Sequence, residues 1–191
     1  MKIGSTIIFG RWPQGEYGEV LPIERKVLKV EADRILLHST CGLQVMPYTE
    51  KGGKVYWETS EIRNWLRTEF VKAFDDEEKE KICEVEVENI RGLTEDETEC
   101  FKTKETIFLL SEDEIRKMCQ DKTTWIRKPS VQSLKLGACA DSDGNGVWWL
   151  RSYGRLEKLS MGVVRTDGGL YPGADVRADD VMVCPAVYIR R

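Results

Sequence analysis

The chain has 191 residues, of which 41% are hydrophobic and 32% are charged. This composition is typical of a globular protein, because disordered chains contain fewer aliphatic and aromatic residues. The length suits one domain, residues 1–191, better than two. The net charge of −4 makes the molecule repel polyanions, so nucleic acid is disfavoured as a partner.

No stretch approaches the roughly 18 consecutive apolar residues that span a membrane. Residues 1–10 contain one lysine and a short apolar run, without the cleavage site of a signal peptide. We therefore expect a cytoplasmic protein without a membrane segment. In that compartment the six cysteines are expected to be reduced.

The N-terminal region predicts β-structure. Residues 5–9 are β-branched or aromatic and stop at Gly10, which indicates a first strand followed by a turn at residues 12–15. Two further apolar runs, 25–30 and 34–38, flank a short connection. This spacing predicts an antiparallel hairpin.

Three short helices follow from periodicity and capping signals. After Thr59 and Ser60, either of which can cap a helix, apolar residues recur at helical spacing at Ile62, Trp65, Leu66 and Phe70. Asp75 with Glu78, and Ser111 with Glu114, form two capping boxes ahead of a second and a third helix.

The other segments predict strands. Valines alternate with glutamates at 84–88, as in a half-exposed strand, whereas 106–110 is a continuous apolar run suited to a buried one. After Pro129, glycines surround short apolar runs at 147–150, 161–164 and 181–189. We expect short strands there, joined by turns and long loops.

Residues 141–146 match the opening half of an EF-hand calcium loop. Counted from Asp141, the twelfth position is Ser152, where the loop requires a glutamate, and an apolar strand follows in place of a helix. Asp, Asn and Gly are also the usual residues of tight turns. A plain turn is the favoured interpretation, and a calcium site is the alternative.

The sequence identifies no catalytic residue, metal site or cofactor. His38 is the single histidine, and it ends an apolar strand, where a structural role is more common than catalysis. No carboxylate stands in an apolar run that would raise its pKa for acid–base work. The glycines show neither of the common nucleotide-binding spacings.

Trp148 and Trp149 are adjacent indoles, which point to opposite faces of a strand. Either both pack structurally, or one lies in the core while the other lines a pocket. Arg151 and Ser152 follow directly. They can pair with an acidic side chain inside the fold or project toward a ligand, and both alternatives stay open.

Short motifs occur in order along nearly the whole chain, at 8–14, 22–24, 62–66, 107–111, 148–152, 167–168 and 183–189. This series resembles a bacterial domain family of unknown function, seen mostly in gut Firmicutes. Its fold is related to the C-type-lectin-like and sulfatase-modifying-factor domains. The resemblance implies an α+β, C-type-lectin-like fold with a mostly antiparallel twisted sheet, two or three short helices and long C-terminal loops.

In the resembled fold the first and last strands usually pair, and the loops between the later strands carry the ligand surface. That region corresponds to residues 152–180. The candidate ligand-binding residues are Trp149, Arg151, Tyr153, Arg155, Asp167, Tyr171 and Arg177. Tyrosine and arginine supply contact area together with directed hydrogen bonds.

The chain departs from the resembled pattern at two positions. Arg25 stands where the family usually has tryptophan, and Cys184 stands where the closing strand usually has arginine. If that arginine normally pairs with an acidic side chain inside the fold, another cation must pair with that side chain here. Our hypothesis is that Arg177 or Arg190 does so.

The favoured function is a non-enzymatic module that binds an unknown protein or a polar small ligand. Sugar binding of the calcium-dependent type is not supported, since its Glu-Pro-Asn, Gln-Pro-Asp and Trp-Asn-Asp motifs are missing. One alternative is a metal-dependent oxidase related to the formylglycine-generating enzymes, although its chemistry needs two close cysteines or several histidines. Another is the variable target protein of a diversity-generating retroelement.

Overall fold

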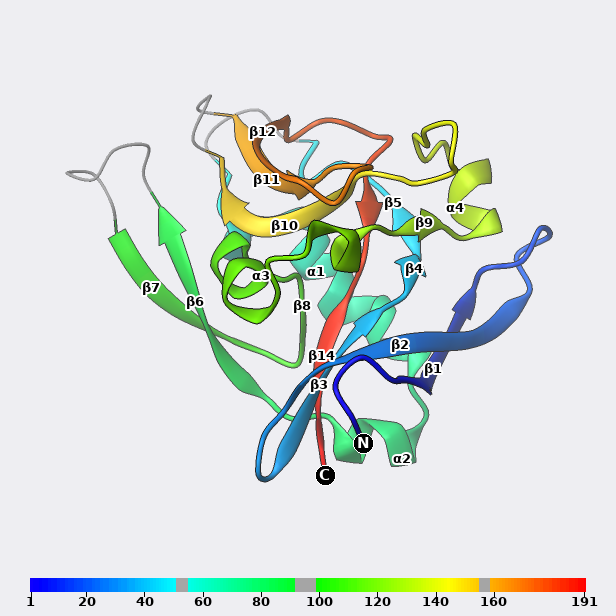
Figure 1. Ribbon diagram of the computed structural model, residues 1–191, viewed down its shortest axis with the longest axis vertical. Coiled ribbons are helices and arrows are strands. Elements are labelled where there is room, and N and C mark those ends of the chain that lie inside the picture. The colour runs from blue at the N-terminus through cyan, green and yellow to red at the C-terminus, as the bar shows by residue number, and fades with distance from the viewer. Residues whose placement is uncertain (51–54, 92–98, 155–158) are drawn as a thin grey trace.

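The computed structural model describes residues 1–50, 55–91, 99–154 and 159–191. Two five-stranded sheets dominate it (Figure 1). The first has the order β1-β2-β3-β14-β8, formed by β1 (Thr6–Pro13), β2 (Val20–Val30), β3 (Arg34–Ser39), β8 (Ile107–Phe108) and β14 (Ala186–Arg190). The second has the order β12-β11-β10-β13-β5, formed by β5 (Gln44–Val45), β10 (Trp148–Tyr153), β11 (Ser160–Val164), β12 (Leu170–Asp175) and β13 (Met182–Val183).

Smaller elements surround these sheets. Two-stranded pairs are formed by β4 (Cys41–Gly42) with β9 (Lys128–Pro129), and by β6 (Val85–Arg91) with β7 (Glu99–Glu105). The helices of the described residues are α1 (Glu61–Thr68), α2 (Asp76–Lys81), α3 (Glu112–Met118) and α4 (Val131–Lys135), with 3-10 turns η1 (Trp57–Thr59), η2 (Phe70–Ala73) and η4 (Lys122–Trp125). Most strand pairs are antiparallel, so the mixed α+β class is confirmed.

The predicted N-terminal hairpin is confirmed, with β2 and β3 antiparallel and Val30 opposite Ile35. The first strand differs from the prediction, because β1 does not stop at Gly10 but continues to Pro13. Gly10 has a φ of +85°, and the β1–β2 register shifts between Ile8 and Arg11. A glycine bulge therefore replaces the predicted stop, since glycine adopts positive φ without a steric cost.

All three predicted helix starts are confirmed. Ser60 accepts a hydrogen bond from the amide of Arg63, and both capping boxes are formed at α2 and α3. The helix α4, which Ser130 caps, lies in a region where only strands and loops were predicted. Its five residues are too few to show a clear helical period.

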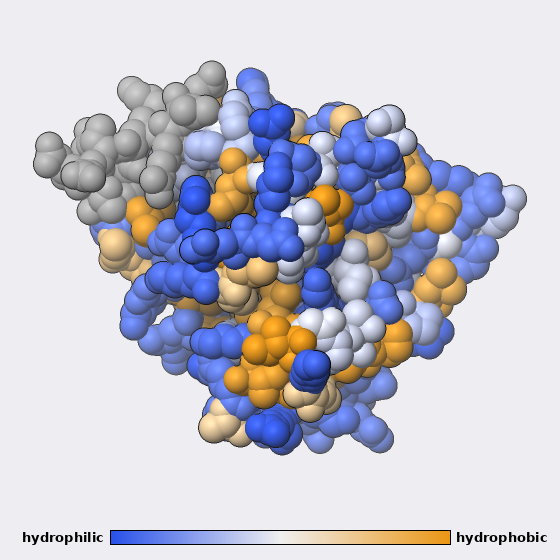
Figure 2. Space-filling model, in the orientation of Figure 1, coloured by the Kyte–Doolittle hydropathy of each residue, from blue (hydrophilic) through white to orange (hydrophobic). Residues whose placement is uncertain are grey.

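The expected pairing of the first and last strands is not found, because β2 and β3 lie between β1 and β14. The last strand, β14, pairs with β3 and β8 instead. Buried side chains from both sheets form the hydrophobic core. Most of the face shown in Figure 2 is hydrophilic, and hydrophobic residues reach it in separate patches. None of the helices in the described ranges combines the length and apolar character needed to cross a membrane.

Candidate functional site

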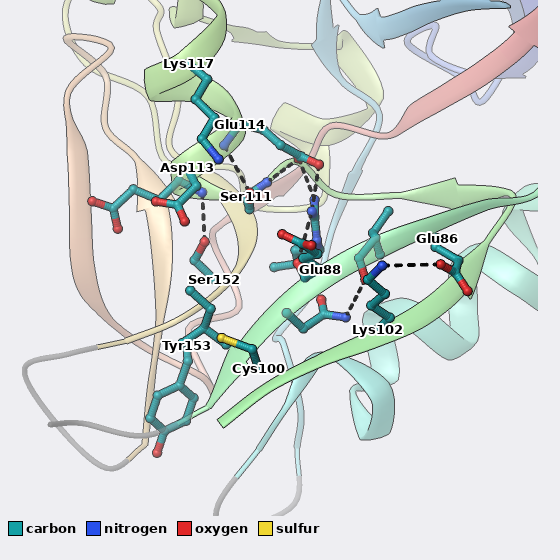
Figure 3. A pocket seen from close by; sticks show the side chains of 15 residues that line it. Glu86, Glu88, Cys100, Lys102, Ser111, Asp113, Glu114, Lys117, Ser152 and Tyr153 are labelled. Atoms are coloured by element: carbon teal, nitrogen blue, oxygen red, sulfur yellow. Dashed lines mark hydrogen bonds and ion pairs between the residues drawn. The ribbon is translucent and has the colours of Figure 1, made fainter. Parts of the chain in front are cut away.

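A cavity of about 420 Å³ lies between the β6–β7 hairpin, the start of α3 and the end of β10 (Figure 3). Residues 86–90 of β6 form one wall, and residues 111–114, at the start of α3, form another. Ser152 and Tyr153 close it from β10. Three segments that are distant in sequence thus meet at one hollow.

The hairpin wall has a charged outer face and a buried inner face. Alternation places Val85, Val87 and Asn89 on the buried face of β6. The inner end of β7 is fixed by Glu105, whose carboxylate accepts hydrogen bonds from Trp57 Nε1 at 2.9 Å and from Arg63 Nε at 2.7 Å. The side chain of Glu105 is fully buried, so this network holds the hairpin against η1 and α1.

The helix wall begins at the Ser111 capping box. Ser111 Oγ accepts from the amide of Glu114, and the Glu114 carboxylate accepts from the amide of Ser111 at 2.8 Å. The amide of Glu112 donates to Ser152 Oγ at 2.8 Å, which joins the first turn of α3 to β10 (Figure 3). The cavity wall is therefore held by hydrogen bonds that satisfy free helix amides.

Arg151 lies beneath the cavity and pairs with Glu114 at two points. Nη1 lies 2.6 Å from Oε2 and Nη2 lies 2.7 Å from Oε1. The guanidinium also donates to the carbonyls of Leu109 and Glu88. Of the two alternatives left open by the sequence, the structure shows the pairing of Arg151 with an acidic side chain inside the fold.

Two buried polar atoms at this cavity have no hydrogen-bond partner among the described residues, Arg151 Nε and Asn89 Oδ1. Both residues are only 4% exposed. The amide nitrogen of Asn89 is already engaged, since it donates to the Val87 carbonyl and to Thr103 Oγ1. An unsatisfied buried donor or acceptor costs about 1–3 kcal/mol, so each of these two atoms lowers the stability of the fold around the cavity.

Tyr153 is the second predicted site residue at the cavity. Its ring stacks on Tyr56 with centroids 5.5 Å apart, and burial raises the pKa of its hydroxyl. Trp149, in contrast, is fully buried, packs against Tyr48 and donates from Nε1 to the carbonyl of Met46. Trp148 is equally buried, so both indoles are core residues and Trp149 presents no ring face to a ligand.

Of the remaining predicted site residues, those that the structure describes do not line the cavity. Asp167 pairs with Lys122 at 3.0 Å, and Arg177 pairs with Asp175 at 3.4 Å, both on the surface. Tyr171 is 39% exposed on β12, and Arg155 lies outside the described residues. The structure thus brings together Arg151 and Tyr153 but not the predicted set.

The hairpin and helix walls of the cavity were not predicted from the sequence. Alternation at β6 and the capping box at Ser111 were both recognised, but as local signals. Neither pattern shows which other part of the protein the strand or the helix packs against. Asn89 had no signal, because a single asparagine in a strand is not distinctive.

A second hollow, of about 540 Å³, lies against Trp125, Lys122 and Gly168. The indole of Trp125 is buried and already donates to the carbonyl of Cys119 at 3.0 Å. Within the described ranges, none of the buried polar atoms that lack a partner belongs to this wall.

The Asp141 segment forms the predicted turn. Asp141 Oδ1 accepts from the amides of Asp143 and Asn145, and Gly144 has a φ of +78°. The carboxylate therefore faces backbone amides, and these bonds lower its pKa. Across the part of the chain that the structure describes, no three Asp, Glu, His or Cys side chains gather as metal ligands.

His38 is fully buried, and its Nδ1 contacts Arg127 Nη2 at 3.1 Å. Burial, followed by the nearby Arg127 and Arg25 guanidinium groups, holds the pKa of His38 well below its ordinary value. Arg127 also donates to backbone carbonyls, including that of Ser39 at 2.9 Å. His38 and Arg127 therefore form a buried cluster in which Arg127 is engaged by His38 and by backbone carbonyls.

The hypothesis about an acidic partner near Cys184 is wrong. The Cys184 thiol is fully buried, and the groups that influence its pKa besides burial are Arg127, Cys41 and Ser39. None of them is a carboxylate. Arg177 pairs with Asp175 at the surface, and Arg190 is exposed at the end of β14.

Residues 32–190 match the family model for a domain of unknown function, DUF6273. No curated protein and no solved structure matches the chain.

Proposed function

Since the chain belongs to the DUF6273 family of domains of unknown function, we propose from its own geometry that it is a non-enzymatic binding module. Its binding site is the hairpin cavity, formed by the β6–β7 hairpin, the start of α3 and the end of β10. The ligand is a polar small molecule or a polar segment of another protein. The loops at 159–180 are not needed for this contact.

The observation that carries the proposal is the cavity itself, about 420 Å³ in volume, whose wall combines carboxylates, lysine side chains and the Ser152 hydroxyl. These groups offer both donors and acceptors of hydrogen bonds to a polar ligand. Tyr153 adds an aromatic surface at the same opening.

The relation to C-type-lectin-like folds is part of the same proposal. Within the matched region 32–190, the first strand is β3 and the last is β14. These two strands pair antiparallel, with His38 opposite Ala186. The resemblance implies that the first and last strands of the whole fold pair, whereas here β14 pairs with the first strand of the matched region and β1 and β2 lie beyond it in the sheet.

The test is a ligand screen by NMR that follows side-chain N–H signals. Arg151 Nε–H and the Asn89 amide report on the cavity, and Arg127 Nε–H, which already donates to Ser39, is the internal control. The library contains amines, carboxylates, polyols and short peptides. Binding that shifts the Arg151 and Asn89 signals but not the Arg127 signal supports the proposal.

Two results contradict it. Ligands that shift only signals of residues 159–180 would place the binding surface on the loops. A library in which no compound at millimolar concentration shifts either cavity signal would show that the hollow is not a binding site.

A further inference from the structure

We infer that two copies of this chain associate through one surface, which is formed by α4 and the turn between β1 and β2. This surface lies outside the hairpin cavity, so the inference goes beyond the proposed function and does not depend on it.

The surface gathers exposed apolar side chains. More than half of the large hydrophobic side chains that are exposed among the described residues lie in two segments, 17–21 and 131–136. They are Tyr17, Val20, Leu21, Val131, Leu134 and Leu136. A single exposed hydrophobic residue is ordinary, whereas a group of them marks an interaction site.

Direct contacts hold the two segments side by side at one end of the molecule (Figure 1). The amide of Gln132 donates to the carbonyl of Gln14 at 3.1 Å, and Lys135 Nζ donates to the carbonyl of Glu16. Lys135 Nζ also lies 4.9 Å from the centre of the Tyr17 ring. The exposed side chains of both segments therefore belong to one region of the surface.

The helix α4 exposes its apolar residues and buries a polar one. Ser133 is fully buried, and its hydroxyl donates to the carbonyl of Gly42 at 2.9 Å. Val131 and Leu134, which lie one turn apart, remain half exposed. A helix that packs only within its own domain normally buries its apolar side. The outer side of α4 therefore has the character of a surface that another molecule covers.

Four charged residues surround this surface, and we call them its rim: Arg11, Glu16, Glu19 and Lys135. Arg11 donates to the carbonyl of Val20, and the carboxylate of Glu19 accepts from the amide of Tyr17. Lys135 lies 3.8 Å from the Glu16 carboxylate. The rim is neutral, because it contains two cations and two carboxylates, so the net charge of −4 belongs to the rest of the chain.

This distribution of charge favours a second copy as the partner. Two copies repel one another over the rest of their surface but not at a neutral rim. In a two-fold symmetric contact, a cation of one copy can face a carboxylate of the other, because the same surface carries both signs. A wholly acidic or wholly basic partner would gain no net attraction there.

Sedimentation equilibrium over a range of protein concentrations tests the inference. We expect the mass to rise from the 21.9 kDa of one chain toward twice that value, with a Kd below about 100 µM. Leu134→Asp should weaken the association at least about tenfold, because it places a charge in the apolar contact. The matched control is Ile90→Asp, which adds the same charge at a 40% exposed side chain outside the surface and should leave the association unchanged. Thermal unfolding checks that both variants are folded.

An exchange of charges tests the two-fold arrangement. The double variant Arg11→Glu, Lys135→Glu has a wholly acidic rim, and the double variant Glu16→Lys, Glu19→Lys has a wholly basic one. Each should remain a monomer alone, because two like rims repel. Mixed in equal amounts, the two variants should form a dimer.

Three results would overturn the inference. The first is a mass of one chain at protein concentrations up to about 1 mM. The second is a dimer that Leu134→Asp leaves intact, since it would form through a different surface. The third is a mixture of the two charge variants that stays monomeric. None of these results bears on the hairpin cavity, which the ligand screen tests separately.

Discussion

Arg151 and Glu114 form a two-point ion pair that joins the middle of β10 to α3, with Nη1–Oε2 and Nη2–Oε1 distances of 2.6 and 2.7 Å. The arginine side chain is 2% exposed and the glutamate side chain is 33% exposed. The same glutamate closes the capping box at Ser111. One carboxylate therefore positions the helix wall of the cavity and neutralises a buried cation.

Replacing Glu114 should destabilise the protein through this pair. Glu114→Gln leaves the Arg151 guanidinium buried without a counter-charge, which we expect to cost about 2–3 kcal/mol, less than a fully buried pair because Glu114 is partly solvated. Urea unfolding measures the loss. Glu112→Gln is the control in the same helix turn, because its partner Arg116 is exposed, and it should cost under about 1 kcal/mol. Equal losses would contradict the prediction.

The buried carboxylate of Glu105 should fix the β6–β7 hairpin. Glu105→Gln removes the charge that Arg63 and Trp57 face, with an expected loss of about 2–4 kcal/mol. Hydrogen exchange should show faster exchange of the β6 and β7 amides. The control is Glu86→Gln on the exposed face of the hairpin, which should have little effect on either measurement. Hairpin exchange that stays at the wild-type rate in Glu105→Gln would refute this role.

Gly168 should not tolerate a side chain. Its φ is +77°, and a Cβ atom there would lie 1.9 Å from the carbonyl oxygen of Lys122. We expect Gly168→Ala to cost at least about 3 kcal/mol, from backbone strain and the displacement of η4. Gly137 has a φ of +102° but open space around its Cβ position, so Gly137→Ala should cost only about 1 kcal/mol. Thermal unfolding of the two variants separates the clash from the strain.

Stability should fall below pH 6.5 because of His38. Burial lowers the pKa of His38 in the folded state, so the unfolded chain takes up the proton first as the pH decreases. The folded state therefore loses up to about 1.4 kcal/mol per pH unit below 6.5, and keeps this contribution fully above it.

His38→Gln should remove this slope between pH 6.5 and 5, measured by urea unfolding at each pH. His38 is the single histidine of the chain, so the difference between the two proteins isolates its titration. A wild-type slope that persists in the variant would contradict the assignment.

The sequence by itself determined the local elements. The capping residues Ser60, Asp75 and Ser111 fixed three helix starts, because a side chain that accepts from the third following amide acts within one turn. Alternation and apolar runs likewise predicted β2, β3, β6, β10, β11 and β14. These signals are local as well, because successive side chains of a strand point to opposite faces of the sheet. The mixed α+β class follows from these elements.

Only the tertiary structure decided what the side chains at 148–153 do. Sequence placed Trp149 and Arg151 at a ligand surface, but β10 is a central strand of its sheet, so Trp149 is enclosed and Arg151 meets Glu114 from a helix 37 residues away. The cavity depends on the approach of the β6–β7 hairpin to α3. That approach is set by long-range packing and buried pairs such as Glu105 with Arg63, whose partners are distant in sequence. Local patterns cannot specify it, because they fix only the direction in which a side chain points.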